Sequence, residues 1–293
     1  MTRVTERDIE LADGRTLHVY EAGRRRSSRL PIMWHHGTPN VGSPPEPLMR
    51  AAKDAGLRWV SFDRPGYGGS TRHEGRTIAS VARDAIAAAD ALGLERFAVM
   101  GHSGGGPHAL AVAALAPDRV LAVSTEGGLA PLGAAGAAGL DLDAWFDGMG
   151  KISATSLRAA LDGPDAKRAY EASAGDGIDF TSRDWEALTG EWGWLGTVAA
   201  AGIASGVDGL IDDDLAYVRP WGVDLARITA PTLLVHGADD RVVPAAHSRW
   251  LAATVPGAEL WQLPGEGHIS ALADDERGAA AAVRWVGEHL TAP

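Results

Sequence analysis

The segment Gly101-His102-Ser103-Gly104-Gly105 places a serine at the centre of a glycine-rich turn. An apolar run at residues 97–100 precedes it and an alanine-rich segment ending near Ala116 follows it, which predicts a buried strand, a sharp turn and a helix. Such a turn strains its central residue and brings neighbouring backbone close, so glycine is required two positions before and two positions after the serine. The Ser103 hydroxyl should then project from the carboxyl end of a sheet as a nucleophile elbow. We expect it to be a catalytic nucleophile, whereas a turn that holds only a phosphate, or no ligand, is the alternative.

A serine hydroxyl is a poor nucleophile at neutral pH and needs a base within hydrogen-bond reach. Histidine suits this task because its pKa lies near neutrality. His268 stands on a Pro-Gly-x-Gly loop after the apolar segment at residues 259–263, and this loop can bring the imidazole over the elbow. We therefore expect His268 to be the base, with a surface-loop histidine as the alternative. The backbone N–H of Gly104 is expected to stabilise the oxyanion that forms during acyl transfer.

Strands and helices that alternate through most of the chain would position these residues. Strands are expected at residues 9–11, 17–20, 31–35, 59–62, 97–100, 120–123, 232–236 and 259–263. Helices are expected at residues 48–55, 78–92, 107–116, 245 to about 250, and 274–289. Asp13-Gly14 predicts a hairpin between the first two strands, and Asp274, Asp275 and Glu276 are expected in the first turn of the last helix. The alternation argues for a parallel sheet covered by helices on both faces.

The alternation breaks between Gly127 and about Pro220, where glycine- and alanine-rich sequence is followed by short helical patterns. We expect a core domain of residues 1–126 and 221–293 and a helical cap of residues 127–220. The cap is rich in tryptophan, and we expect Trp145, Trp192 and Trp194 to bind an apolar part of the substrate. Filling the small core of the cap is the alternative role for each of them. The run Asp212-Asp213-Asp214 is expected to be a solvated charge cluster.

Composition restricts the class of protein. The chain has 293 residues, of which 45% are hydrophobic, enough for one large core with an insertion. It has no cysteine, which excludes disulfides, thiolate metal sites and a cysteine nucleophile. A net charge of -11 disfavours nucleic acid and anionic membranes as partners. Adjacent His35 and His36 are expected to point to opposite faces of a strand and therefore cannot share a metal ion, so we expect no metal. We also expect no cofactor. No apolar signal segment begins the sequence, and we expect a cytoplasmic protein.

Five motifs in this order resemble the α/β-hydrolase superfamily over nearly the whole chain. They are His36-Gly37-Thr38-Pro39, residues 63–70, the elbow, residues 237–244, and Gly267-His268. The resemblance implies an α/β-hydrolase fold, which has a mostly parallel eight-stranded sheet with helices on both faces and a helical cap inserted after the sixth strand.

The resemblance also implies the remaining members of a catalytic site. Asp240 matches the family's acid after the seventh strand, where it would orient His268 and stabilise the imidazolium. Glu126 is the alternative acid, because some members of the superfamily take it from the end of the sixth strand. Thr38 matches the second oxyanion donor through its backbone N–H, and its hydroxyl is a candidate third donor.

Serine in the elbow excludes the aspartate-nucleophile members of the superfamily, the epoxide hydrolases and haloalkane dehalogenases. We expect an esterase or lactonase that cleaves a small to medium apolar ester or lactone through an acyl-enzyme intermediate. A carbon–carbon bond hydrolase, a perhydrolase in the manner of cofactor-free haloperoxidases, and a peptidase like proline iminopeptidase are alternatives on the same triad. A small-molecule receptor with a slow triad is the alternative outside enzymes. The sequence leaves the natural substrate and the oligomeric state open.

Overall fold

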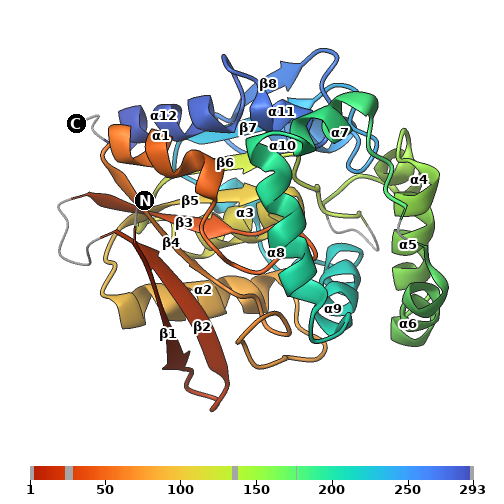
Figure 1. Cartoon of the computed structure of the whole chain (residues 1–293), viewed down its shortest axis with the longest axis horizontal. Coiled ribbons are helices and arrows are strands. Elements are labelled where there is room, and N and C mark those ends of the chain that lie inside the picture. Colours follow the sequence, from red (N-terminus) through yellow and green to blue (C-terminus); the bar gives the residue numbers. More distant parts are fainter. Residues whose placement is uncertain (1–2, 24–28, 134–137, 176, 291–293) are drawn as a thin grey trace.

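The computed structural model describes residues 3–23, 29–133, 138–175 and 177–290. Eight strands form one sheet in the order β1-β2-β4-β3-β5-β6-β7-β8 (Figure 1). Strand β2 runs antiparallel to both of its neighbours, whereas the other pairs in the sheet are parallel. The predicted α/β architecture with a mostly parallel eight-stranded sheet is therefore confirmed. The strands are β1 (Val4–Glu10), β2 (Thr16–Ala22), β3 (Leu30–His35), β4 (Leu57–Phe62), β5 (Phe97–His102), β6 (Val120–Glu126), β7 (Thr232–Gly237) and β8 (Glu259–Leu263).

Central strands of the sheet are buried on both faces. In β5, Phe97 and Val99 belong to one hydrophobic cluster, while Ala98 and Met100 belong to the other. This explains why the strand reads as a continuous apolar run rather than an alternating one. The helices that cover the two faces are α1 (Met49–Asp54), α2 (Ile78–Leu92), α3 (Gly106–Leu115), α10 (Ala246–Thr254), α11 (Ser270–Ala273) and α12 (Ala279–Leu290). Alanines of α2 and α3 enter the first cluster, and those of α1 and α12 enter the second.

Local signals at the ends of elements act as expected in most places. The hairpin between β1 and β2 turns through Gly14, whose φ of 82° favours glycine. Helix α2 has the predicted bounds, because Thr77 and Ser80 form a capping box and Gly93 ends the helix in the left-handed region.

The start of the last helix differs from the prediction. Helix α12 begins at Ala279, and the three acidic residues lie in the turn before it. The Asp274 carboxylate accepts the backbone N–H groups of Glu276 (3.1 Å) and Arg277 (2.6 Å), so it forms this turn instead of occupying the first turn of the helix.

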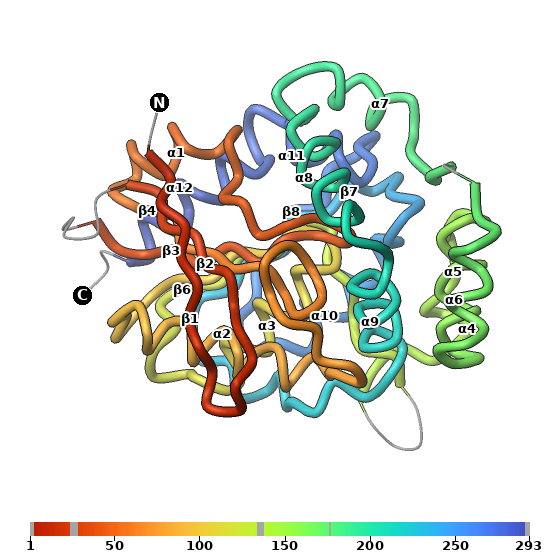
Figure 2. Tube along the Cα trace, turned by 60° about the horizontal axis from the view of Figure 1, so that its bottom comes forward, coloured from red at the N-terminus to blue at the C-terminus, as the bar shows by residue number. Residues whose placement is uncertain are grey.

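A helical insertion follows β6, as predicted. Its helices are α4 (Leu142–Phe146), α5 (Lys151–Leu161), α6 (Pro164–Ser173), α7 (Ser182–Leu188), α8 (Trp194–Ile203) and α9 (Asp208–Tyr217). Helices α4, α5 and α6 stand together at one side of the molecule (Figures 1 and 2), and α4 also contacts α10 of the core through Trp145 and His247. Buried residues of the insertion, including Trp145 and Ile211, belong to the same hydrophobic cluster as the core helices. The boundaries of the cap at residues 127 and 220 stay a prediction.

No single helix in the described ranges is long and apolar enough to cross a membrane. One bent pair, Glu191–Ile203 with Asp208–Tyr217, meets the length and composition criteria together, with a 106° angle between the two helices.

Candidate active site

The turn after β5 has the strained geometry expected of a nucleophile elbow. Ser103 has a φ of 53° and is the one non-glycine residue with positive φ among those the structure describes. A Cβ atom at Gly101 would collide with the carbonyl oxygen of Gly105, and one at Gly105 would collide with that of His35. The expected need for glycine on both sides of the serine is therefore confirmed. A single 3-10 turn, Ser103–Gly105, leads directly into α3.

The structure brings Ser103, His268 and Asp240 together from three different strand ends. The Nε2 atom of His268 lies 2.9 Å from Ser103 Oγ, and its Nδ1 atom lies 2.7 Å from Asp240 Oδ2. Asp240 Oδ1 accepts the backbone N–H groups of Val242 (2.8 Å) and Val243 (2.9 Å), which set the orientation of the carboxylate. This is the hydrogen-bonded order of nucleophile, base and acid that acyl transfer requires.

Charge in this chain is arranged to favour a protonated imidazole. Burial opposes protonation of His268, but the Asp240 carboxylate outweighs burial and raises the pKa of His268. Burial would raise the pKa of Asp240, but His268 and His236 hold it well below its ordinary value. Asp240 is therefore ionised at neutral pH and able to stabilise an imidazolium.

Glu126, the alternative acid, lies in a different environment. It ends β6, and its Oε1 atom accepts a hydrogen bond from Ser124 Oγ at 2.5 Å. Burial raises the pKa of Glu126 to about 8, so its carboxyl group is mostly uncharged at neutral pH. An uncharged group gives little stabilisation to an imidazolium, and the geometry favours Asp240 over Glu126 as the partner of His268.

The predicted oxyanion donors also lie beside the serine. Thr38 and Gly104 line the same cavity as Ser103. The Thr38 hydroxyl lies 2.6 Å from Asp213 Oδ2 and 2.7 Å from the Tyr217 hydroxyl, while the Tyr217 hydroxyl lies 3.0 Å from the Gly104 carbonyl oxygen. The single proton of Thr38 is thus directed at a carboxylate, and this geometry disfavours its hydroxyl as the candidate third donor. The two backbone N–H groups remain as candidate donors.

Asp213 organises a buried ionic network behind the oxyanion loop, so the expectation of a solvated acidic cluster is wrong. Its side chain has no exposed surface, and it bonds to the guanidinium groups of Arg64 (2.6 Å) and Arg76 (2.5 Å). The Tyr67 hydroxyl donates to the same carboxylate at 2.8 Å. Burial would raise the pKa of Asp213, but the two arginines hold it well below its ordinary range. Arg64 also donates to the carbonyl oxygen of His36, so the network braces the loop that carries Thr38.

The other two aspartates of the run are paired as well. Asp212 accepts a hydrogen bond from Arg72 at 2.8 Å, and Asp214 lies 2.6 Å from the buried ammonium group of Lys167. Burial raises the pKa of Asp214 in spite of Lys167. Sequence reasoning missed these roles because the cations come from distant segments. The apolar residues Ile211 and Leu215 on either side of the run were the available signal of burial.

A cavity of about 570 Å³ opens beside Ser103. Residues of α5 and α6 line one side of it and residues of α8 and α9 the other. Figure 1 shows the positions of these four helices. The insertion supplies polar side chains to its lining, which are Ser153, Ser156, Tyr170, Glu171, Asp214 and Tyr217. Its larger apolar lining residues are Leu129, Ile152, Leu157, Ile178, Ile203, Val207, Leu210, Val242 and Val243.

None of the three tryptophans expected to bind substrate lines this cavity. Trp145 has no exposed surface, and its indole N–H donates to the Ala130 carbonyl oxygen at 2.9 Å. Trp192 is buried in the second hydrophobic cluster, and Trp194 packs against that cluster. The expectation is corrected here, because these rings fill the junction between the insertion and the core, where the largest apolar area can be buried.

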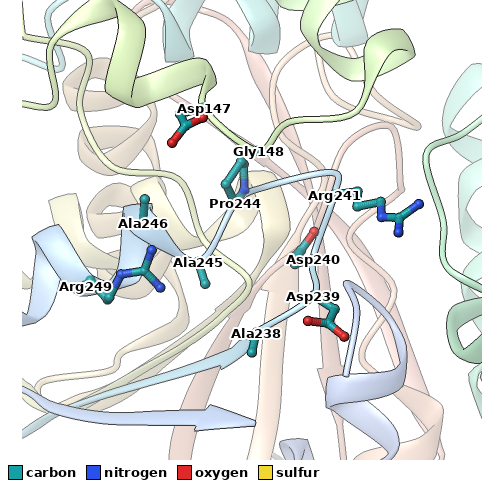
Figure 3. Close-up of a pocket in the computed structure, with 10 residues that line it drawn as sticks. All are labelled: Asp147, Gly148, Ala238, Asp239, Asp240, Arg241, Pro244, Ala245, Ala246 and Arg249. Atoms are coloured by element: carbon teal, nitrogen blue, oxygen red, sulfur yellow. The ribbon is translucent and has the colours of Figure 1, made fainter. Parts of the chain in front are cut away.

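A second cavity, of about 450 Å³, lies outside the loop that follows β7 (Figure 3). Its wall includes Asp147 and Gly148 of the insertion, and Asp240 and Arg249 of the core. Neither Ser103 nor His268 lines it, so it gives no access to the nucleophile. Within the described part of the chain, no three histidine or carboxylate side chains are grouped as a metal site.

Comparison with known proteins identifies the family of this chain. Residues 31–275 match the sequence profile described as "alpha/beta hydrolase fold". The chain belongs to the α/β-hydrolase family. It is 29% identical to a non-heme haloperoxidase of Rhodococcus erythropolis over 267 residues, covering 89% of this chain and 92% of that protein. It is 28% identical to rhodomycin D methylesterase DauP of a Streptomyces species, covering 84% of this chain and 86% of that protein.

Solved structures show the same fold. The enol-lactonase of Burkholderia xenovorans superposes with a TM-score of 0.70 at 22% identity, covering 98% of this chain and all (100%) of that one. An esterase from Exiguobacterium antarcticum superposes with a TM-score of 0.69 at 21% identity, covering 96% and 99% of the two chains. The fold of this α/β hydrolase is therefore shared with enzymes of differing substrates.

Proposed function

We propose that this α/β hydrolase is a serine esterase or lactonase, in which Ser103, His268 and Asp240 form the catalytic triad. The observation that carries the proposal is the chain of hydrogen bonds from Asp240 through His268 to Ser103, whose hydroxyl faces a largely apolar cavity. We also propose that residues 127–220 act as a cap over a core of residues 1–126 and 221–293.

The reaction follows from the positions of the atoms. Ser103 Oγ attacks the ester carbonyl carbon while His268 Nε2 accepts its proton. The N–H groups of Gly104 and Thr38 stabilise the oxyanion of the tetrahedral intermediate. His268 then returns the proton to the departing alkoxide, which leaves as an alcohol and yields the acyl-enzyme. Water, deprotonated by His268, attacks the acyl carbon, and the collapse of the second intermediate releases the acid and restores Ser103.

The lining of the cavity favours binding of an apolar acyl or alkyl group of small to medium size. Aliphatic side chains from α5, α8 and α9 and from the loops beside them line much of the cavity, so a hydrocarbon chain would bury apolar surface there. A lactone fits the same chemistry, because opening the ring keeps the alkoxide and the acyl group in one molecule. The likeness to a methylesterase and to the fold of an enol-lactonase is in keeping with either substrate.

Covalent labelling tests the nucleophile. A fluorophosphonate should add once to the wild-type protein, and Ser103→Ala should abolish the adduct and lower kcat for an activated acetate ester by at least ~10³. Ser173→Ala is the control, because Ser173 is exposed on α6 and bonds only to backbone carbonyls. Intact-mass spectrometry that finds no adduct on the folded wild type would reject the proposal.

Perhydrolysis is a second candidate, favoured by the likeness to a non-heme haloperoxidase. In this reaction hydrogen peroxide replaces water as the group that attacks the acyl-enzyme, and a peracid leaves instead of an acid. Halide oxidation that depends on both an acyl donor and peroxide, and that is lost with Ser103→Ala, would support it.

A further inference from the structure

The loop that carries His268 is held by a residue of the insertion. Asp184 lies in α7, and its side chain is almost fully buried against residues 267–270. Its Oδ1 atom accepts the backbone N–H groups of Ile269 (2.7 Å) and Ser270 (2.9 Å). These are the two residues that follow His268, so one carboxylate oxygen bonds directly to the backbone beside the imidazole.

The residue before His268 is fitted to the same carboxylate. A Cβ atom at Gly267 would collide with both oxygens of Asp184, so only glycine lets the carboxylate approach this closely. The Gly267 N–H donates to Ser270 Oγ at 2.7 Å, which closes the loop on itself. The residues on both sides of His268 therefore contact Asp184: Gly267 packs against the carboxylate, and the backbone of Ile269 and Ser270 bonds to it.

Among the residues that the structure describes, no cation bonds to the Asp184 carboxylate. The remaining oxygen accepts the N–H and the hydroxyl of Thr181, both at 2.8 Å, so all four groups that donate to this carboxylate are uncharged. The adjacent Arg183 instead forms an ion pair with Glu266. Burial would raise the pKa of Asp184, but the backbone N–H groups lower it, and the residue is ionised at neutral pH.

In the described part of the chain, the ionisable groups closest to His268 are Asp240, Asp184 and His102. Asp240 bonds to its Nδ1 atom, and the negative charge of Asp184 also raises the pKa of His268. His102, at the end of β5, has its ring centre 5.1 Å away. Burial lowers the pKa of His102 to about 3, so it is neutral near pH 7 and adds no charge. The imidazole thus lies in the field of two carboxylates, one from the core and one from the insertion.

We propose that Asp184 is a positioning residue of the catalytic site, which holds His268 at hydrogen-bond distance from Ser103 and places a second negative charge near the imidazole. The insertion would then complete the catalytic geometry in addition to covering the cavity. This inference rests on the proposed function of Ser103 and His268.

Two variants separate tethering from charge. Asp184→Asn keeps an oxygen for the N–H groups of Ile269 and Ser270, gives up the acceptor that faces Thr181 and removes the charge, so the pKa of His268 should fall while the tether to its loop remains. Because the neutral imidazole is the base, the acidic limb of the pH profile of kcat/KM should move to lower pH. Asp184→Ala removes the tether, and kcat should fall by about 10–100-fold with little change in KM, the scale of a small misplacement of a catalytic group.

Asp179→Asn is the matched control. Asp179 is another carboxylate of the insertion that accepts a backbone N–H, that of Ser153 at 2.7 Å, but its hydrogen bond lies within the insertion. Its pH profile should match that of the wild type. NMR titration of the His268 ring protons measures the same pKa without relying on turnover, and thermal unfolding shows whether each variant is folded.

The outcomes are distinct. A folded Asp184→Asn protein whose His268 titrates as in the wild type would overturn the charge effect, and a folded Asp184→Ala protein with unchanged kcat would overturn the tether. If Asp184→Ala does not fold, Asp184→Ser, whose shorter side chain also withdraws the acceptor from Ile269 and Ser270, replaces it as the test of the tether, and the Asn variant still decides the charge effect. Failure of the wild type to react with a fluorophosphonate would instead reject the proposed function, whatever the NMR titration shows.

Discussion

Replacing Asp240 by asparagine tests the triad most directly, because the structure dictates how the new amide must lie. The Oδ1 position accepts two backbone N–H groups, from Val242 and Val243, and only an oxygen satisfies both. The amide NH₂ must therefore occupy the Oδ2 position, 2.7 Å from His268 Nδ1. It would donate to Nδ1, which forces the imidazole proton onto Nε2, the atom that faces Ser103 at 2.9 Å.

A histidine in this tautomer cannot accept the proton of the serine. We expect Asp240→Asn to lower kcat at neutral pH by about 10⁴, the loss measured when a triad acid is amidated in a serine protease. At 1.36 kcal/mol for each tenfold change, this corresponds to about 5.4 kcal/mol of transition-state stabilisation. Steady-state hydrolysis of an activated acetate ester measures kcat and KM, and thermal unfolding confirms that the variant is folded.

Glu126→Gln is the matched control for this substitution. The Glu126 carboxyl bonds to Ser124, is mostly protonated at neutral pH and ends a neighbouring strand, so kcat should fall tenfold or less. If Glu126→Gln loses about 10⁴ in kcat while Asp240→Asn stays near the wild type, the assignment of the acid and the tautomer argument are both refuted.

Two further predictions concern the cavity and the core. Ile152 and Leu161 are both on α5 and both 38% exposed, but only Ile152 lines the cavity. Ile152→Ala should therefore lower kcat/KM for a hexanoate ester relative to an acetate ester by about five- to tenfold, which corresponds to a loss of about 1 kcal/mol of apolar contact. Leu161→Ala is the control and should keep the wild-type ratio across a chain-length series. Glu126→Gln should also change the pH dependence of stability: burial raises the pKa of Glu126 from 4.5 to about 8, so the wild type loses stability as the pH rises through that range and the variant does not. Urea unfolding between pH 4.5 and 8 measures the difference, and a constant gap between the two proteins would contradict this account.

Much of the fold could be predicted from the sequence because its signals are local. The bounds of α2 follow from the capping box at Thr77 and from Gly93, both of which act within one turn of helix. The need for Gly101 is local, because a Cβ atom there would meet the backbone of Gly105 in the same turn, whereas the need for Gly105 comes from His35 of β3, which only the fold brings close. The predicted start of the last helix is wrong because an aspartate such as Asp274 is favourable both in the first turn of a helix and in a turn before it. The local sequence does not distinguish these two positions, and in the structure Asp274 forms the turn.

The sequence by itself determined that Ser103 lies at a strand end and that an acid and His268 follow it in order. It could not show which carboxylates face which partners. The Asp213 carboxylate meets Arg64 across 149 residues of chain, and Asp184 meets the backbone of Ile269 across 85. Whether an aspartate is solvated, paired with a cation or bonded to a catalytic loop depends on the groups that packing brings to it. The sequence around the aspartates of the insertion does not distinguish these roles, because their partners lie in distant segments of the chain. The tertiary structure likewise decided that tryptophans fill the junction and that isoleucines line the cavity, because hydrophobicity favours burial without choosing which surface is covered.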